Sequence, residues 1–138
     1  MNIYTVNYIL SRLSFAMAAA LAIPLVLAIV GKEASREAFM LSVFVSIFFG
    51  IAFRRYGSPS DDLTPREGIA ITAFGWFTGT FLGMLPYFLG NYLGFLDALF
   101  ESISGFTGTG ATVVTDIEAL PQGVLLWRSL THWLGGLG

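Results

Sequence analysis

The chain has 138 residues, of which 55% are hydrophobic and 12% charged, with a formal net charge of −2 and a mean hydropathy of +0.74. That charge fraction is about half of what a soluble domain carries, so the sequence predicts an integral membrane protein of all-α fold. The sequence shows no basic stripe and therefore no nucleic-acid partner; it has no cysteine for disulfides or thiolate metal sites, and one histidine, His132, argues against a histidine-built metal centre.

Two apolar runs predict a pair of transmembrane helices within residues 1–56. The first, 13–31, is uncharged, follows a mildly polar lead that carries Arg12, and nearly crosses a hydrocarbon core of about 30 Å. Its length and the lack of a small-x-small cleavage site before a soluble domain favour a retained span over a signal peptide. The second, 38–53, is short for a span, but Arg54 and Arg55 can extend it. A re-entrant or interfacial helix is the alternative for this run.

Residues 57–67 predict a polar loop on the cytoplasmic side. Gly57 and Pro59 break helices, and Thr64-Pro65-Arg66-Glu67 predicts the start of the next helix, with a threonine cap, a proline at the first position and a glutamate three residues after the cap. Orientation follows from the Lys and Arg count, because cytoplasmic loops carry an excess of these residues. Four fall on the side of the N-terminus and this loop (Arg12, Arg54, Arg55, Arg66) and two on the other (Lys32, Arg36), which predicts a cytoplasmic N-terminus.

Residues 68–138 predict one helix–pore loop–helix repeat. A helix over 68–89 carries Gly75, Gly79 and Gly83 four residues apart, a spacing that favours close packing against another helix. A short helix over 96–106 follows, and it covers only about 15 Å, half of a bilayer. We expect it to enter from outside and stop halfway, so that the partial negative charge of its C-terminal carbonyls attracts a cation. The last helix starts within 121–138, and we expect it to be truncated.

The loop at 107–112 is the candidate ion site. Gly108 and Gly110 can adopt backbone angles closed to other residues, so successive carbonyls can face one direction. Together with the threonine hydroxyls they offer hard, neutral oxygens, which suit an alkali cation and not zinc. A flexible glycine loop without a ligand is the alternative. The loop is irregular backbone in an apolar chain, which membranes tolerate only where protein buries it or water reaches it.

One charged pair is predicted behind this loop. Arg128 lies in membrane-buried sequence and needs a partner, and Glu101, one turn into the short helix, is the best candidate. We interpret the pair as a structural brace for the loop. His132, four residues after Arg128, is expected to make a hydrogen bond within the bundle, with proton sensing as the alternative.

Two motifs follow one another between residues 101 and 138: Glu-Ser-Ile-Ser-Gly-Phe-Thr-Gly-Thr-Gly-Ala-Thr from Glu101, and Trp-Arg-Ser-Leu-Thr-His-Trp-Leu-Gly-Gly from Trp127. Together they resemble the first pore repeat of TrkH-type potassium uptake proteins in the Trk/Ktr/HKT superfamily, which have four such repeats around one ion path and, in this branch, two helices before the first. The resemblance implies potassium uptake, with Gly110 as the filter glycine. It implies potassium binding by the backbone carbonyls of the loop (Thr107, Gly108, Thr109, Gly110, Ala111, Thr112). The sequence departs at Gly108, where the resemblance leads us to expect threonine.

The resemblance also sets expectations for the whole protein. One repeat supplies a quarter of a selectivity filter, so we expect an N-terminal fragment of a longer protein, with self-assembly of this chain as the alternative. It implies a multi-pass protein of a bacterial inner membrane, a homodimer of the full-length protein, a cytosolic nucleotide-binding regulatory subunit, potassium as the only metal and no organic cofactor. Channel-like passage and symport with protons or sodium both stay open.

Two other functions compete with this interpretation. A sodium-coupled secondary transporter would use the same loop as the break in a helix. An intramembrane serine protease would pair Ser104 with His132, but its GxSG pattern fails at Ser102. No lysine follows Gly110, so a nucleotide-binding P-loop is excluded, and we predict that the protein is not an enzyme.

Overall fold

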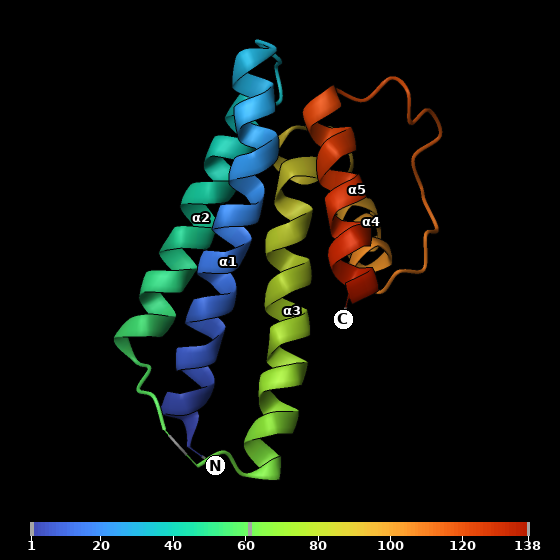
Figure 1. The fold of residues 1–138 in the computed structure, drawn as a ribbon. Helices are drawn as coiled ribbons and strands as arrows, with labels where there is room; N and C mark the ends of the chain where they lie inside the picture. The colour runs from blue at the N-terminus through green and yellow to red at the C-terminus, as the bar shows by residue number, and fades with distance from the viewer. Residues whose placement is uncertain (1, 61, 138) are drawn as a thin grey trace.

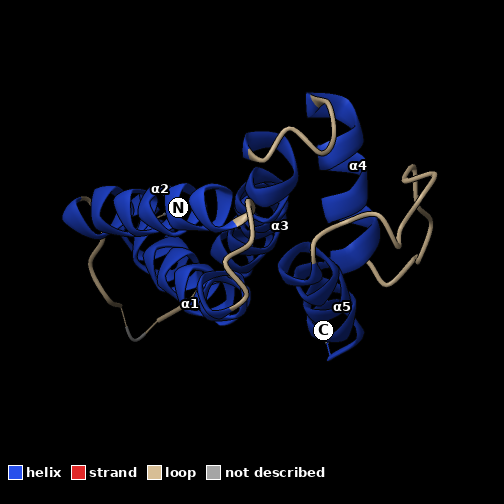
Figure 2. Ribbon diagram, turned by 90° about the horizontal axis from the view of Figure 1, so that it is seen from above, coloured by secondary structure: helices blue, strands red, loops and turns tan. Residues whose placement is uncertain are grey.

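The computed structural model describes residues 2–60 and 62–137 and contains five helices (Figure 1). They are α1 (Ile3–Val30), α2 (Arg36–Arg55), α3 (Pro65–Leu89), α4 (Phe95–Phe106) and α5 (Gln122–Leu137). Helices α1, α2 and α3 are long and apolar enough to cross a membrane. Seen from above, α1 and α2 lie on one side of α3, and α4 and α5 lie on the other (Figure 2). The predicted all-α membrane fold is confirmed.

Helix α1 begins ten residues earlier than the apolar run that predicted it. Its cap is Asn2, whose side chain accepts a hydrogen bond from the Tyr4 N–H at 3.1 Å. The expected polar lead is therefore wrong as a description of structure: residues 3–12 continue the helix. Hydropathy marks the stretch that suits lipid, whereas a helix extends as far as its backbone bonds and cap allow. The 28 residues of α1 measure about 42 Å, which exceeds a hydrocarbon core of about 30 Å.

A stripe of small residues joins α2 to α1. Ala38, Ser42, Ser46 and Gly50 recur every fourth residue, and all four are buried. Each serine hydroxyl donates to the carbonyl four residues earlier, at 2.6 and 2.8 Å, so neither leaves an unpaired polar group in the interface. A Cβ on Gly50 would lie 2.8 Å from the Phe15 ring of α1. Helix α2 has 20 residues and measures about 30 Å, the length of a span rather than of a re-entrant segment.

The core lies where α4 and α5 meet the half of α3 that is nearer the α1–α2 connection. Its largest member is Trp127 of α5, which is fully buried and donates its indole N–H to the Gly83 carbonyl of α3 at 2.9 Å. A Cβ on Gly83 would approach the Phe106 ring at 2.5 Å and the Ser102 hydroxyl at 2.6 Å. Gly79, by contrast, has no atom within 4 Å of an added Cβ. The predicted three-glycine packing face is thus correct at Gly83 and wrong at Gly79.

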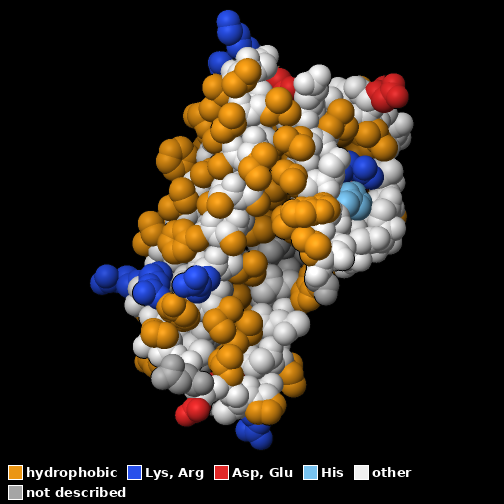
Figure 3. All heavy atoms as spheres, viewed as in Figure 1, with side chains coloured by type: hydrophobic (Ala, Val, Ile, Leu, Met, Phe, Trp, Pro, Cys, Tyr) orange, Lys and Arg blue, Asp and Glu red, His pale blue; other side chains and the backbone are white. Residues whose placement is uncertain are grey.

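The outer surface of the long helices is apolar. Hydrophobic side chains are spread along the visible face of these helices (Figure 3). On α2, Phe44, Phe48 and Ile51 are each more than half exposed. Exposed apolar surface on this scale is what a lipid-facing helix presents. The N-terminus and the α2–α3 connection lie at one end of the bundle, and the α1–α2 connection lies at the other (Figure 1).

Candidate ion-binding loop

Helix α4 is a half-length helix seated on α3. Its 12 residues measure about 18 Å. One stripe is buried and contains Ala98, Glu101, Ser102 and Gly105, while the opposite face exposes apolar side chains. The Ser102 hydroxyl donates to the Thr80 carbonyl at 2.7 Å. Because Thr80 lies in the interior of α3, the C-terminal end of α4 stops well short of the far end of that helix (Figure 1).

A Schellman motif ends α4 and turns the chain into the loop. Gly108 N–H donates to the Gly105 carbonyl at 3.1 Å, and Thr109 N–H donates to the Ser104 carbonyl at 3.1 Å. This motif needs a residue in the left-handed conformation, and Gly108 has φ +70°. A β-branched residue is strained at that angle, which gives a physical reason for glycine where the family resemblance leads one to expect threonine. The prediction that Gly108 and Gly110 take angles closed to other residues is confirmed, since Gly110 has φ +76°.

The loop presents free backbone oxygens. Among the described residues, the carbonyls of positions 107–110 accept no hydrogen bond, and these residues are exposed. The Ala111 carbonyl accepts from the Ser104 hydroxyl at 2.5 Å, which leaves it one lone pair. The threonine protons are directed inward: the Thr107 hydroxyl donates to the Ile103 carbonyl at 2.7 Å and lies 2.8 Å from the Thr109 hydroxyl. The loop thus offers neutral oxygens and no charged ligand.

Glu101 holds the end of the loop from behind. Glu101 is buried, with 1% of the residue exposed, and its Oε1 accepts hydrogen bonds from the Val113 N–H at 2.8 Å and from the Thr112 hydroxyl. Its Oε2 lies 3.4 Å from Nε of Arg128 on α5. The structure therefore brings together the two residues of the predicted brace. A buried carboxylate needs such partners, because an unpaired charge in a dry interior costs several kcal/mol.

Helix α5 packs on the end of α4 through small residues. A Cβ added to Gly105 would meet the Thr131 side chain, and one added to Gly135 would meet the carbonyls of Gly105 and Phe106. The Arg128 carbonyl accepts from the Thr131 hydroxyl at 2.8 Å and lies 2.7 Å from Nδ1 of His132. The imidazole thus makes a hydrogen bond within the bundle, as predicted for His132.

Ser104 and His132, the two residues of the serine-protease alternative, have different hydrogen-bond partners. Ser104 donates to the loop carbonyl of Ala111, and His132 is bonded to the backbone of its own helix. Within the described part of the chain, the structure does not join these two side chains in a hydrogen bond. That arrangement lacks the nucleophile–base contact on which serine catalysis depends.

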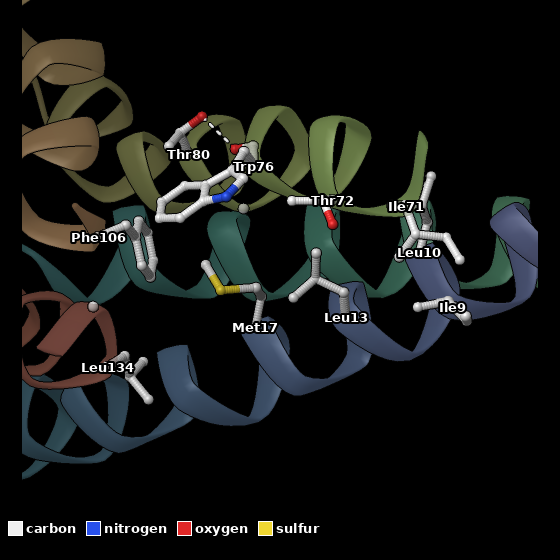
Figure 4. Close-up of a pocket in the computed structure, with 13 residues that line it drawn as sticks. Ile9, Leu10, Leu13, Met17, Ile71, Thr72, Trp76, Thr80, Phe106 and Leu134 are labelled. Atoms are coloured by element: carbon white, nitrogen blue, oxygen red, sulfur yellow. Dashed lines mark hydrogen bonds between the residues drawn. The ribbon is translucent and has the colours of Figure 1, made fainter. Parts of the chain in front are cut away.

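A cavity of about 360 Å³ lies between the N-terminal part of α1 and α3, and it extends as far as the C-terminal end of α4 (Figure 4). Leu10, Leu13, Met17 and Trp76 line it, and Phe106 and Leu134 lie at one end. The two threonines in its wall donate their hydroxyls to carbonyls of their own helix, Thr72 to Gly68 at 2.9 Å and Thr80 to Trp76 at 2.7 Å. An apolar wall of this kind offers a cation almost no ligands, and the cavity is distinct from the candidate ion-binding loop.

Among residues 2–60 and 62–137, no group of three or more His, Cys, Asp and Glu side chains is placed to hold a metal ion. The oxygens of the loop are hard and neutral, which fits a monovalent alkali cation better than a transition metal.

Sequence reasoning missed several residues that build this site. Ser104 and Ser102 hold the loop and α4 by donating to distant carbonyls, and Gly135 lets α5 approach the end of α4. The spacing of Thr131 and Gly135, a small-xxx-small pair on α5, was a signal for that approach. For the serines no signal existed, because hydroxyl residues are common in membrane helices and their partners lie on other elements.

Comparisons with known proteins agree on one family. A family model described as "Cation transport protein" (TrkH) matches residues 35–138. An uncharacterized cation transporter of Methanocaldococcus jannaschii is 35% identical over 91 residues, which cover 65% of this chain and 19% of the relative. The Trk system potassium uptake protein TrkH of Halomonas elongata is 44% identical over 79 residues, 56% of this chain and 16% of the relative.

A solved structure gives the same result over the full length of the chain. The crystal structure of the potassium transporter TrkH from Vibrio parahaemolyticus superposes with a TM-score of 0.93 at 27% identity, covering 100% of this chain and 30% of that protein. The chain therefore spans less than a third of the length of the relatives it matches.

Proposed function

The chain belongs to the TrkH family of cation transport proteins, and from that premise we propose that it forms one of four repeats around a potassium uptake path through a cell membrane. The carbonyls of Thr107, Gly108, Thr109, Gly110, Ala111 and Thr112 supply a quarter of the selectivity filter. The observation that carries the proposal is the pair of positive φ angles at Gly108 and Gly110, next to four carbonyls that accept no hydrogen bond within the described residues.

Transport through this loop requires only dehydration and passage of an ion. Carbonyl oxygens replace part of the hydration shell of the cation, and neutral ligands hold it weakly enough for it to leave. The C-terminal end of α4 adds a partial negative charge behind the loop. Glu101 and Arg128 act as the brace: the carboxylate accepts the Val113 N–H at 2.8 Å, and Arg128 holds the carboxylate at 3.4 Å.

Relatives support the choice of ion. The Halomonas elongata relative is a potassium uptake protein, and the Vibrio parahaemolyticus structure is that of a potassium transporter. By the same resemblance we propose a homodimer of the full-length protein with a cytosolic nucleotide-binding regulatory subunit, and a bacterial inner membrane with the N-terminus in the cytoplasm. The N-terminus and the α2–α3 connection share one end of the bundle, as that orientation requires.

Rubidium uptake tests the proposal. The full-length protein is expressed in bacterial cells that lack their own potassium uptake systems, and growth at low potassium is measured together with labelled rubidium influx. We expect growth and saturable influx that sodium inhibits weakly. A protein that restores neither refutes the proposal. Influx that requires sodium on the same side would instead favour the sodium-coupled secondary transporter.

A further inference from the structure

The connection between α1 and α2 holds a carboxylate against the start of α5. Glu33 Oε2 accepts a hydrogen bond from the Gly123 N–H at 3.0 Å, across 90 positions of sequence, and another from the Ser35 hydroxyl at 2.9 Å. Gly123 is the second residue of α5, where backbone N–H groups have no partner within the helix. A carboxylate there satisfies one of them and also interacts favourably with the positive end of the helix dipole.

Two helix ends direct side chains to this place. Helix α1 ends in a Schellman motif, with Lys32 at φ +51° and the Glu33 N–H bonded to the Ala28 carbonyl at 2.9 Å. Helix α3 ends in the same way, with Asn91 at φ +56°, and this turn sets the position of Tyr92. Burial raises the pKa of the Tyr92 phenol, and the negative charge of Glu33 raises it further. Glu33, which the first turn positions, therefore lies at the start of α5, and its charge acts on the Tyr92 phenol that follows the second turn.

The contact is tightly fitted. A Cβ added to Gly123 would lie 3.0 Å from Glu33 Oε2 and 3.2 Å from the Phe39 ring. Gly123 is buried, and so is Phe39. The start of α5 consequently has little freedom to move relative to the α1–α2 connection while the hydrogen bond is in place.

Helix α5 connects this cap to the ion-binding loop. Arg128 follows Gly123 by five residues, about 7.5 Å along the same helix. Its Nε lies 3.4 Å from Glu101 Oε2, and Glu101 Oε1 accepts the Val113 N–H at the end of the loop at 2.8 Å. A shift of α5 along its axis moves Arg128, and with it the carboxylate that holds the loop.

We propose that Glu33 is a positioning residue for the ion-binding loop, acting through the cap on α5 and the Arg128–Glu101 pair. This inference rests on the proposed function of the loop. It assigns the α1–α2 hairpin, which lies across α3 from the loop (Figure 2), a role in ion selection without lining the ion path. The hairpin would set the geometry that the carbonyls present.

The test compares Glu33→Ala and Glu33→Gln with wild type in the full-length protein. The KM for rubidium, the maximal rate and the rubidium-to-sodium preference are measured in the uptake-deficient cells. Loss of a helix cap reduces the population of the capped conformation by about a factor of five. We therefore expect Glu33→Ala to raise the KM about fivefold and to reduce the rubidium-to-sodium preference. Glu33→Gln shifts both less, because its amide oxygen still accepts the Gly123 N–H. Glu37→Ala is the matched control, since Glu37 lies four residues later and is exposed.

The split between KM and maximal rate separates positioning from general stability. A purely structural role reduces the number of active molecules, so the maximal rate falls while the KM and the ion preference stay unchanged; that result overturns the inference. If Glu33→Ala does not reach the membrane, Glu33→Gln and Gly123→Ala decide by the same criterion. A wild-type protein that moves no rubidium overturns the proposed function, and this inference with it, whereas an active wild type with unaltered variants overturns the inference alone.

Discussion

Replacing Gly110 by alanine isolates the backbone conformation of the loop. Gly110 has φ +76°, and an added Cβ would have no atom within 4 Å. Steric crowding is therefore absent, and the whole effect comes from the left-handed angle, which costs an L-residue about 1–2 kcal/mol. Relief of that strain requires rotation of the peptide units on either side, which carry the carbonyls proposed to bind the ion.

The expected size of the effect follows from that strain. A penalty of about 1–2 kcal/mol reduces the population of the native loop conformation by a factor of about 5–30. Gly110→Ala should therefore raise the KM for rubidium by about that factor and weaken discrimination against sodium. The protein should still fold, because nothing in the core touches this position.

The same chemical change at Gly68 provides the control. Gly68 lies in the first turns of α3, also has no atom within 4 Å of an added Cβ, and has no positive φ. Gly68→Ala should leave the uptake kinetics unchanged and stabilise the helix by up to about 1 kcal/mol. Rubidium influx and the thermal unfolding midpoint of the purified protein are measured for both variants. If Gly110→Ala has the same uptake kinetics as Gly68→Ala, the left-handed angle at Gly110 does not control ion binding.

Three further predictions follow from the packing and the ion pair. Glu101→Ala should destabilise the protein by about 3 kcal/mol, because it leaves Arg128 and the loop without their partner. Exchange of both charges, Glu101→Arg with Arg128→Glu, should restore uptake only in part, since an arginine cannot accept a hydrogen bond from the loop N–H. No restoration of uptake at all would contradict the brace. Lys32→Gly should stabilise the protein by about 1 kcal/mol in thermal unfolding, because Lys32 has φ +51°; a lower midpoint would show that its side chain matters more than its backbone angle. Gly83→Leu should destabilise by about 1–3 kcal/mol against the Phe106 ring, whereas Gly79→Leu, which enters open space, should change stability little, and equal losses would contradict the packing described.

Much of the fold follows from charge and apolar length. The charged turn near residue 32 and the polar loop at 57–67 separate three apolar runs, which predict α1, α2 and α3. The predicted helix after the third run, 96–106, is too short to span a bilayer, so α4 could be recognised as well. The start of α1 could not, because Arg12 ends the apolar run while the backbone continues helically to the Asn2 cap. Hydropathy indicates which residues suit lipid, whereas the position of a helix end depends on local hydrogen bonds.

The site could be predicted where a single residue type restricts the backbone. Glycine at positions 108 and 110 indicated positive φ angles, and a membrane-buried arginine required an acidic partner, which Glu101 supplies at 3.4 Å. The contact between Glu33 and Gly123 joins residues 90 positions apart, and the sequence around either residue carries no mark of the other. Likewise, Ser102 and Ser104 donate to backbone carbonyls, which no residue type marks in the sequence, so these hydrogen bonds can be found only in the structure.

Direct observation of a bound ion is the closest test of whether the carbonyls of residues 107–112 bind potassium. Rubidium and thallium(I) replace potassium and scatter X-rays anomalously, so crystals of the full-length protein grown with either ion can locate it. We expect an anomalous peak at coordination distance from the backbone carbonyls of residues 107–112. Strong peaks elsewhere in the membrane region, with none at this loop, would contradict it.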